Sequence, residues 1–276
     1  DQDQRKIDAL SRGEIPIYEP GLETMIKNNV AKKRLIFTTD LESAVSTADI
    51  VFIAVGTPTR AEDGHADLSY VMAASKSIAS ALQGYTVIVT KSTVPVGTGR
   101  VVEALMRKTN PSADFDMASN PEFLREGSAL EDFMRPDRVV VGTQSARAEE
   151  MMRQLYRPLY LLATPMLFTS LESAELIKYA ANAFLATKIA FINEIADICE
   201  KCDADIQDVA QGMGMDSRIG SAFLNTGPGY GGSCFPKDTL ALAQTARMLE
   251  RPTSIVEAVI AANDQRRHTM FHKIME

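Results

Sequence analysis

Cys234 lies in a segment whose residue types could activate a thiol. Two glycines at 231–232 precede it, and Pro236 suits the first turn of a helix, which places Cys234 at or beside the N-cap. A thiolate there would be stabilised by the free N–H groups of the helix start and by Lys237, with the carboxylate of Asp238 at hand. The segment predicts an activated nucleophile. A buried structural cysteine in a helix-start loop is the alternative interpretation.

Lys178 and Asn182 stand four residues apart in a long apolar pattern and so share one face of the expected helix. Asn193 returns to nearly the same face. Polar groups on a largely buried helix need partners. A lysine and an amide directed at one point could stabilise a developing oxyanion. The alternative is a lysine whose head reaches water and an asparagine that is satisfied in the core.

Two carboxylates follow directly after the expected strand 115–119. Glu122 and Glu126 stand on one face of a short turn that Asn120 and Pro121 would begin. Ligands of open α/β sheets bind beyond the carboxyl ends of the strands, which favours acid–base or water-positioning work for these carboxylates. Two solvated surface carboxylates are the alternative.

Loops 55–59 and 92–98 also follow expected strands. Their small and hydroxyl residues permit close approach of a cofactor to the backbone. Asp1 and Asp3 could be the acidic residue that binds ribose hydroxyls in dinucleotide-binding folds, but no G-x-G-x-x-G loop precedes them. We therefore expect that a first strand, the glycine loop and a second strand, about 30 residues, are missing upstream.

The elements that must position these residues change in character along the chain. Apolar strands alternate with helices in the first part, as in a parallel sheet covered on both faces. We expect strands at 34–39, 49–55, 86–92, 115–119 and 138–143 and helices at 41–47, 68–83, 98–109 and 145–156. Helices are expected afterwards at 172–202, 205–212, 236–249 and 253–267. The prediction is an incomplete doubly wound, Rossmann-like α/β domain over residues 1–168 and an all-helical central domain over 169–276.

The composition of the chain argues against several classes of protein. The net charge of −7 and the lack of a basic stripe argue against nucleic acid. No apolar run approaches the ~20 residues that a membrane helix needs. Three cysteines are too few for a disulfide scaffold, so a reducing cytoplasm is expected. Cys199 and Cys202 are read as two buried thiols rather than metal ligands, and no metal site is expected.

Taken together, these segments resemble the UDP-glucose/GDP-mannose dehydrogenase family along essentially the entire chain. The matching stretches are IPIYEPGL (15–22), VGTPT (55–59), KSTVPVGT (91–98), NPEFLREGSA (120–129), PDRVVVG (136–142), ELIKYAANAFLATKIAFINE (175–194) and FLNTGPGYGGSCFPKD (223–238).

The resemblance implies two hydride transfers to NAD that convert a primary alcohol to a carboxylate, through a thiohemiacetal and then a thioester on a cysteine. The implied catalytic residues are Cys234, Lys178, Asn182, Asp238, Glu122 and Thr93. The implied NAD-binding residues are Asp1, Val55, Gly56, Thr57, Pro58, Thr93, Glu126 and Lys237. The implied residues for the nucleotide sugar are Glu122, Phe123, Leu124, Lys178, Asn182, Arg218, Phe223, Asn225, Tyr230 and Gly231.

The resemblance favours UDP-glucose as substrate, because Ser233 precedes Cys234 and Phe235 follows it. GDP-mannose or another nucleotide sugar is the alternative. The family also carries a third, C-terminal domain, which we expect to be missing here. A non-catalytic dimerisation fragment is a further alternative, since helix 172–202 could pair with its copy in a homodimer. A simple hydroxyacid dehydrogenase would have no use for Cys234.

Overall fold

The structure, a computed structural model, describes residues 1–60, 65–160 and 163–275. The chain divides into two units. The first comprises residues 1–57 and 67–175, and the second comprises residues 58–66 and 176–276. The sequence places a domain boundary between residues 168 and 169, and that placement stays a prediction.

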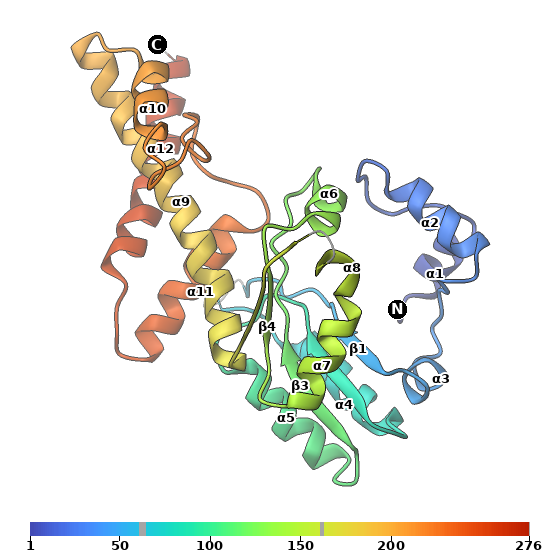
Figure 1. Ribbon diagram of the computed structural model, residues 1–276. Coiled ribbons are helices and arrows are strands. Elements are labelled where there is room, and N and C mark those ends of the chain that lie inside the picture. Colours follow the sequence, from blue (N-terminus) through green and yellow to red (C-terminus); the bar gives the residue numbers. More distant parts are fainter. Residues whose placement is uncertain (61–64, 161–162, 276) are drawn as a thin grey trace. The chain divides into compact units, whose positions relative to one another are not determined.

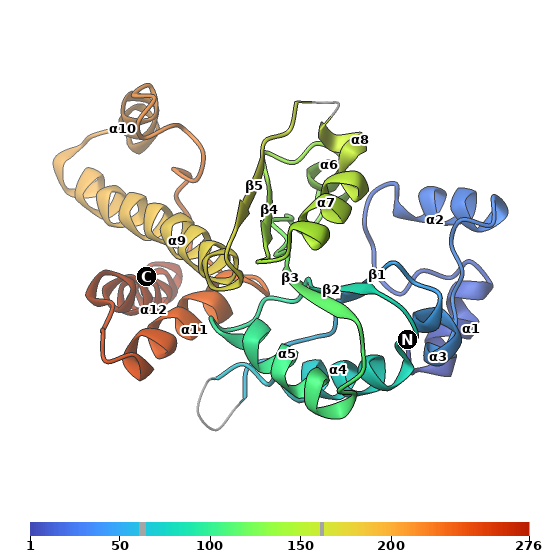
Figure 2. The same cartoon turned by 60° about the horizontal axis from the view of Figure 1, so that its bottom comes forward.

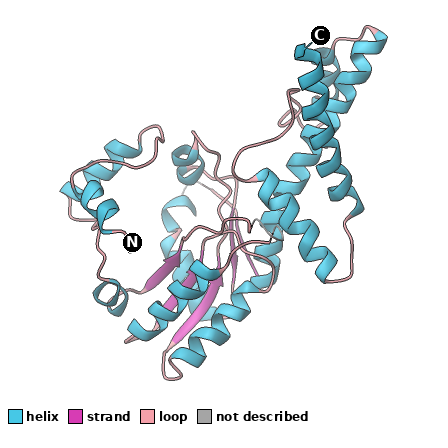
Figure 3. Ribbon diagram, turned by 180° about the vertical axis from the view of Figure 1, so that it is seen from behind, coloured by secondary structure: helices cyan, strands magenta, loops and turns pink. Residues whose placement is uncertain are grey.

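The first unit holds every strand of the described chain (Figure 3). Its sheet has the order β1-β2-β3-β4-β5. The strands are β1 Ile50–Ile53, β2 Thr86–Thr90, β3 Phe115–Ser119, β4 Val139–Gly142 and β5 Met166–Thr169. The helices of this unit are α1 Gln4–Ser11, α2 Leu22–Ala31, α3 Leu41–Ser46, α4 Ser69–Ala81, α5 Thr98–Thr109, α6 Ala129–Met134, α7 Ala146–Leu155 and α8 Arg157–Tyr160.

Helices cover both faces of this sheet (Figures 1 and 2). Successive side chains of β2 point to opposite faces. Ile88 joins a core cluster with α4 and α5, whereas Val87 and Val89 join a second cluster with α7. All five residues of β2 are buried, as expected of a central strand between two helical layers. The predicted α/β fold class is confirmed.

Two strand predictions are corrected. Residues 34–39 form no strand, and Ile36 is 78% exposed. A strand is stable only beside a hydrogen-bonded partner, and no described strand pairs with this segment. The sheet is also not wholly parallel, because β4 joins β3 in the antiparallel sense through Ser119 and Gly142. An antiparallel neighbour needs no crossover across a face of the sheet, so the short connection through α6 suffices.

The second unit is helical. Its helices are most of α9 (Leu171–Cys202), α10 Ile206–Gly214, α11 Phe235–Met248 and α12 Ser254–Met275. Among the described residues, no helix combines the length and the hydropathy that a membrane crossing requires.

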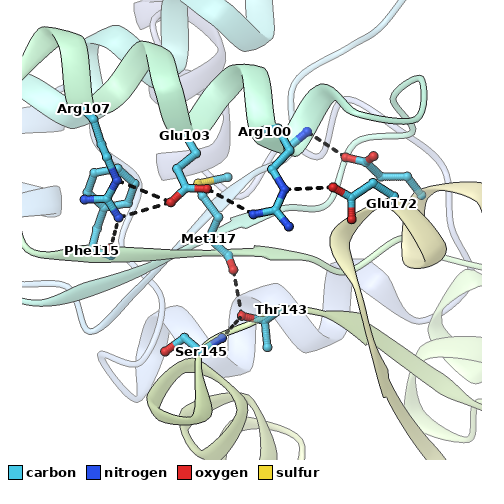
Figure 4. A network of polar contacts seen from close by, with 10 residues as sticks. Arg100, Glu103, Arg107, Phe115, Met117, Thr143, Ser145 and Glu172 are labelled. Atoms are coloured by element: carbon cyan, nitrogen blue, oxygen red, sulfur yellow. Dashed lines mark hydrogen bonds and ion pairs between the residues drawn. The ribbon is translucent and has the colours of Figure 1, made fainter.

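The first turn of α9 belongs to the first unit and is packed tightly there. Arg100 of α5 donates from Nε to Glu172 at 2.8 Å, and Figure 4 shows Arg100 between Glu103 and Glu172. Glu175 accepts hydrogen bonds from the backbone N–H groups of Gly97 and Gly99 at 2.6 and 2.7 Å. These bonds satisfy free donors at the start of α5.

Candidate active site

Asp238 is the centre of a polar group in the second unit. Its side chain is fully buried in the first turn of α11. Asn182 donates from Nδ2 to one carboxylate oxygen at 2.6 Å, and Lys237 donates from Nζ to the other at 2.5 Å. A buried carboxylate needs such donors. The structure therefore brings together three residues that the sequence proposed from two distant segments.

Cys234 is the N-cap residue of α11, where the sequence placed it. Its thiol is free and partly exposed, and it makes no capping hydrogen bond. The backbone carbonyl of Cys234 accepts from the N–H of Asp238 at 2.9 Å, so the two residues occupy one helical turn. The side chain is available for chemistry beside the positive end of the helix dipole.

Lys178 and Asn182 lie one turn apart on α9 and are 3% and 7% exposed. A lysine whose head reaches water would be far more exposed, so that alternative does not describe Lys178. A buried ammonium group and a buried amide on one helix face are suited to stabilising negative charge on a bound oxygen.

The loop before Cys234 contains four of the residues predicted for the nucleotide sugar, Phe223, Asn225, Tyr230 and Gly231. The rings of Phe223 and Tyr230 pack edge-on against Phe235, with centroid distances of 6.0 and 6.3 Å. Phe223 has a positive φ of 64°, an uncommon conformation for an aromatic residue. Asn225 and Gly231 are exposed. The loop therefore combines a packed aromatic base with an accessible rim.

Arg218 stands apart from this packing. Its side chain is 87% exposed and pairs with Asp216, with Nη2 at 2.6 Å from Oδ2. A guanidinium has five N–H donors, so Arg218 can keep this ion pair and still donate to a ligand.

In the first unit, Glu122 is held by its own turn. Its Oε2 accepts from the N–H of Leu124 at 2.6 Å. The ring of Phe123 lies under the guanidinium of Arg138, 3.8 Å from the ring centroid. Glu126, the second predicted carboxylate of this turn, is exposed.

The two loops predicted to bind the cofactor are joined within the first unit. Thr57 donates from Oγ1 to the carbonyl of Thr93 at 2.9 Å, and Ser92 donates from Oγ to the carbonyl of Val55 at 2.6 Å. They follow the adjacent parallel strands β1 and β2. No atom lies within 4 Å of where a Cβ on Gly56 would stand, so this backbone is open to a ligand.

The remaining cofactor predictions are spread over the chain. Asp1 accepts from the N–H of Asp3 at 2.9 Å, and Asp3 caps α1. Pro58 begins the segment that belongs to the second unit.

The expectation of two buried thiols is corrected for one of them. Cys199 is buried, but Cys202 is exposed, because it is the last residue of α9. The described residues contain no group of side chains suited to a metal ion.

Two polar residues hold these segments in roles that the sequence did not predict. Asn120 is 1% exposed, donates to the carbonyl of Val140 at 2.7 Å and accepts from Lys91 and Tyr156. Glu19 accepts from the N–H groups of Gly127 and Ala129 at the start of α6. Their partners are distant in the chain, so only their location in matching motifs could have singled them out.

Models of known protein families match two successive parts of the chain. The model of the UDP-glucose/GDP-mannose dehydrogenase family, NAD binding domain, matches residues 1–160, and the model of the family's central domain matches residues 172–265. The chain belongs to the UDP-glucose/GDP-mannose dehydrogenase family. The residues predicted for the active site lie within these two matched ranges.

Relatives within the family agree with this assignment. The chain is 61% identical to a UDP-glucose 6-dehydrogenase from Rhizobium meliloti (strain 1021), over 100% of this chain and 63% of that protein. It is similar to the structure of a UDP-glucose dehydrogenase from Pyrobaculum islandicum, with 41% identity, a TM-score of 0.91 and coverage of 95% and 61%. It is also similar to a GDP-mannose dehydrogenase from Pseudomonas aeruginosa, with 32% identity, a TM-score of 0.76 and coverage of 100% and 64%. The chain thus spans about three fifths of the length of the relatives it matches.

Proposed function

We propose that the whole protein oxidises UDP-glucose to UDP-glucuronate with NAD, with Cys234 as the nucleophile. The observation that carries this proposal is a free thiol at the N-terminus of α11, one turn from a buried carboxylate held by Asn182 and Lys237. The printed names of the relatives from Rhizobium meliloti and Pyrobaculum islandicum support UDP-glucose as the sugar.

The cysteine explains how an alcohol can reach the carboxylate level. The Cys234 thiol adds to the carbonyl carbon of the aldehyde, forming a C–S bond and moving its proton to a base. Loss of hydride from the carbon of this thiohemiacetal, with transfer of its hydroxyl proton to a base, leaves a thioester. Water then adds, the C–S bond breaks, and the carboxylate and the thiol are released. NAD, when bound, supplies the acceptor for the hydride in each oxidation.

Other residues of the chain take distinct roles in this scheme. Lys178 and Asn182 stabilise the negative oxygen of the tetrahedral stages. Asp238 accepts and returns protons at the thiol and at water. Glu122 and Thr93 position water or handle protons. Phe123, Leu124, Arg218 and the loop Phe223, Asn225, Tyr230 and Gly231 bind the nucleotide sugar.

The first unit fits a dinucleotide. Open backbone at Gly56, between Val55 and Thr57, lies beyond the carboxyl end of β1, where such ligands bind in α/β sheets. We assign Asp1 to the adenosine ribose, Pro58 and Thr93 to the cofactor loops, and Glu126 and Lys237 to the nicotinamide end. The thiols of the described residues are all free, in keeping with a reducing cytoplasm.

We also propose a homodimer formed through α9. The apolar side chains of Phe184, Phe191 and Ile198 are 66%, 47% and 60% exposed. A seven-residue spacing returns to one face of a helix, so these side chains form a stripe that a copy of α9 could cover.

The test of this function is turnover by the protein in its full natural length. UDP-glucose, GDP-mannose and a UDP-N-acetylhexosamine are supplied with NAD, and products are identified by mass spectrometry. Conversion of UDP-glucose to its uronate supports the proposal. Turnover of GDP-mannose alone would overturn the sugar, and no uronate from any of the three would overturn the function.

A further inference from the structure

The loop from 223 to 232 is held by side chains from two helices at Gly227. Asn193 of α9 accepts from the N–H of Gly227 through Oδ1 at 2.9 Å. Arg266 of α12 donates from Nε to the carbonyl of Gly227 at 3.0 Å. Arg266 is anchored in turn by Asp197, with Nη1 at 2.5 Å from Oδ1. Both backbone groups of one glycine are therefore occupied by side chains from α9 and α12.

A second attachment lies three residues later. Asn263 of α12 accepts from the N–H of Tyr230 at 2.8 Å and donates to the carbonyl of Tyr230 at 3.1 Å. This pair of bonds imitates the pairing of two strands. Gly229 has a φ of 111°, and a Cβ there would stand 2.5 Å from Oδ1 of Asn263. Asn263 thus requires glycine at position 229, both for the backbone conformation and for space.

These attachments are buried although the loop's rim is exposed. Asn193, Asn263 and Arg266 are 2%, 3% and 9% exposed, whereas Gly231 and Gly232 are exposed. A glycine-rich segment loses much conformational entropy when it is ordered. Phe223 and Tyr230 pack against Phe235, but the glycines between and after them have no side chains, so their backbone depends on the three polar side chains beneath the loop.

The held segment leads directly to the nucleophile. Tyr230 is four residues before Cys234, and its ring packs edge-on against Phe235, the first residue of α11. An altered backbone at Tyr230 would therefore shift both the loop and the start of the helix that Cys234 caps.

We propose that Asn263 is a positioning residue for the nucleotide-sugar site, with Asn193 and Arg266 in a supporting role. It contacts the backbone of the loop and holds the loop in the conformation that binds the sugar nucleotide. The inference rests on the proposed function in assuming that this loop binds the substrate.

The test compares Asn263→Ala with the wild type in the full-length protein. Gln265→Ala is the matched control, because Gln265 is exposed on the same helix. Loss of two hydrogen bonds to the loop is expected to raise KM for UDP-glucose by about tenfold or more. KM for NAD should stay within about twofold, as should all values for Gln265→Ala.

A double-mutant cycle with Gly229→Ala tests the contact itself. Each single change should raise KM for UDP-glucose, and the double variant should show less than the product of the two effects, because removal of the Asn263 side chain makes room for the new methyl group. Full multiplicativity, or equal rises in both KM values, would overturn the proposal. If Asn263→Ala does not fold, Asn193→Ala removes one bond to the loop, and an unchanged KM there would overturn it as well.

The two hypotheses fail in different ways. A wild type that neither turns over nor binds UDP-glucose by calorimetry contradicts the proposed function. A wild type that turns over UDP-glucose, beside an Asn263→Ala variant that loses thermal stability at unchanged KM, contradicts only the positioning role.

Discussion

Asn182 and Asp238 are joined by a hydrogen bond of 2.6 Å between buried side chains of α9 and α11. The bond links the helix that carries Lys178 to the helix that Cys234 caps. It is therefore the contact that relates the predicted oxyanion-stabilising residues to the predicted nucleophile.

Asp238→Asn should impair both catalysis and folding. The variant lacks a proton acceptor, so kcat should fall by about 10²-fold or more. An amide NH₂ would face a donor from Asn182 or Lys237, which should cost about 1–3 kcal/mol of the free energy of unfolding. Steady-state kinetics and urea unfolding measure the two effects. Met248→Ala, at an exposed position of α11, should change neither. An unchanged kcat in Asp238→Asn would remove Asp238 from the mechanism.

Glu175 should make stability depend on pH. Burial raises the pKa of Glu175 to about 7 from its usual 4.5, although the N–H groups of Gly99 and Gly97 act in the opposite direction. The native state therefore binds more protons than the unfolded state between these values. The contribution of Glu175 to stability is full below about pH 4.5 and is lost as the pH rises through about 7.

The measurement compares unfolding of the wild type and Glu175→Gln between about pH 5 and 8. Relative to the variant, the wild type should lose up to about 3 kcal/mol over this range. In Glu172→Gln the difference from wild type should stay flat, because the hydrogen bond from Arg100 lowers the pKa of Glu172 from its usual value. A flat difference for Glu175→Gln as well would show that the buried carboxylate stays charged throughout.

Sequence patterns predicted the elements that fold from local signals. Helix α5 spans residues 98–109 as predicted, since its apolar period and its basic last turn are both local. The strand at 34–39 was wrong and β5 was missed, because strand formation depends on partners that no local pattern encodes.

The residues of the site show the same contrast between local signals and distant contacts. Cys234 was placed at a helix start from Pro236 and its neighbours alone. Asn263 and Arg266 were missed because single polar residues in a helix usually face water. Their burial becomes visible only when α12 packs against the loop at Gly227 and Tyr230.

Gly142→Ala should destabilise the junction of β4 with α9. A Cβ there would stand 2.5 Å from the carbonyl oxygen of Ser170 and 2.7 Å from Cβ of Ala174. Neither neighbour can move without shifting a backbone, so we expect a loss of about 1–3 kcal/mol or more. Gly84→Ala meets no atom within 4 Å and should stay within about 0.5 kcal/mol of wild type. Chemical unfolding measures the free energy of unfolding of both variants, and equal values would contradict the close packing at Gly142.

If the apolar stripe of α9 forms the dimer interface, charged substitutions in it should lower the mass of the protein in solution. Replacing Phe184 and Phe191 by Asp should convert a dimer to a monomer in light scattering, because charge cannot be buried in an apolar interface without a partner. Met215→Asp introduces one such charge at a site that is 80% exposed outside this stripe and should leave the mass unchanged. A dimer that persists in the double variant would place the interface elsewhere.

The central claim is that Cys234 carries the substrate between two oxidations. The most direct measurement is the number of NADH molecules formed per UDP-glucose consumed, for the full-length wild type and for Cys234→Ser. We predict two in the wild type and, in the variant, release of uronate reduced by at least about 10³-fold, because a serine hydroxyl is a far weaker nucleophile than a thiolate. One NADH per sugar in the wild type, or unimpaired uronate formation by Cys234→Ser, would contradict the account.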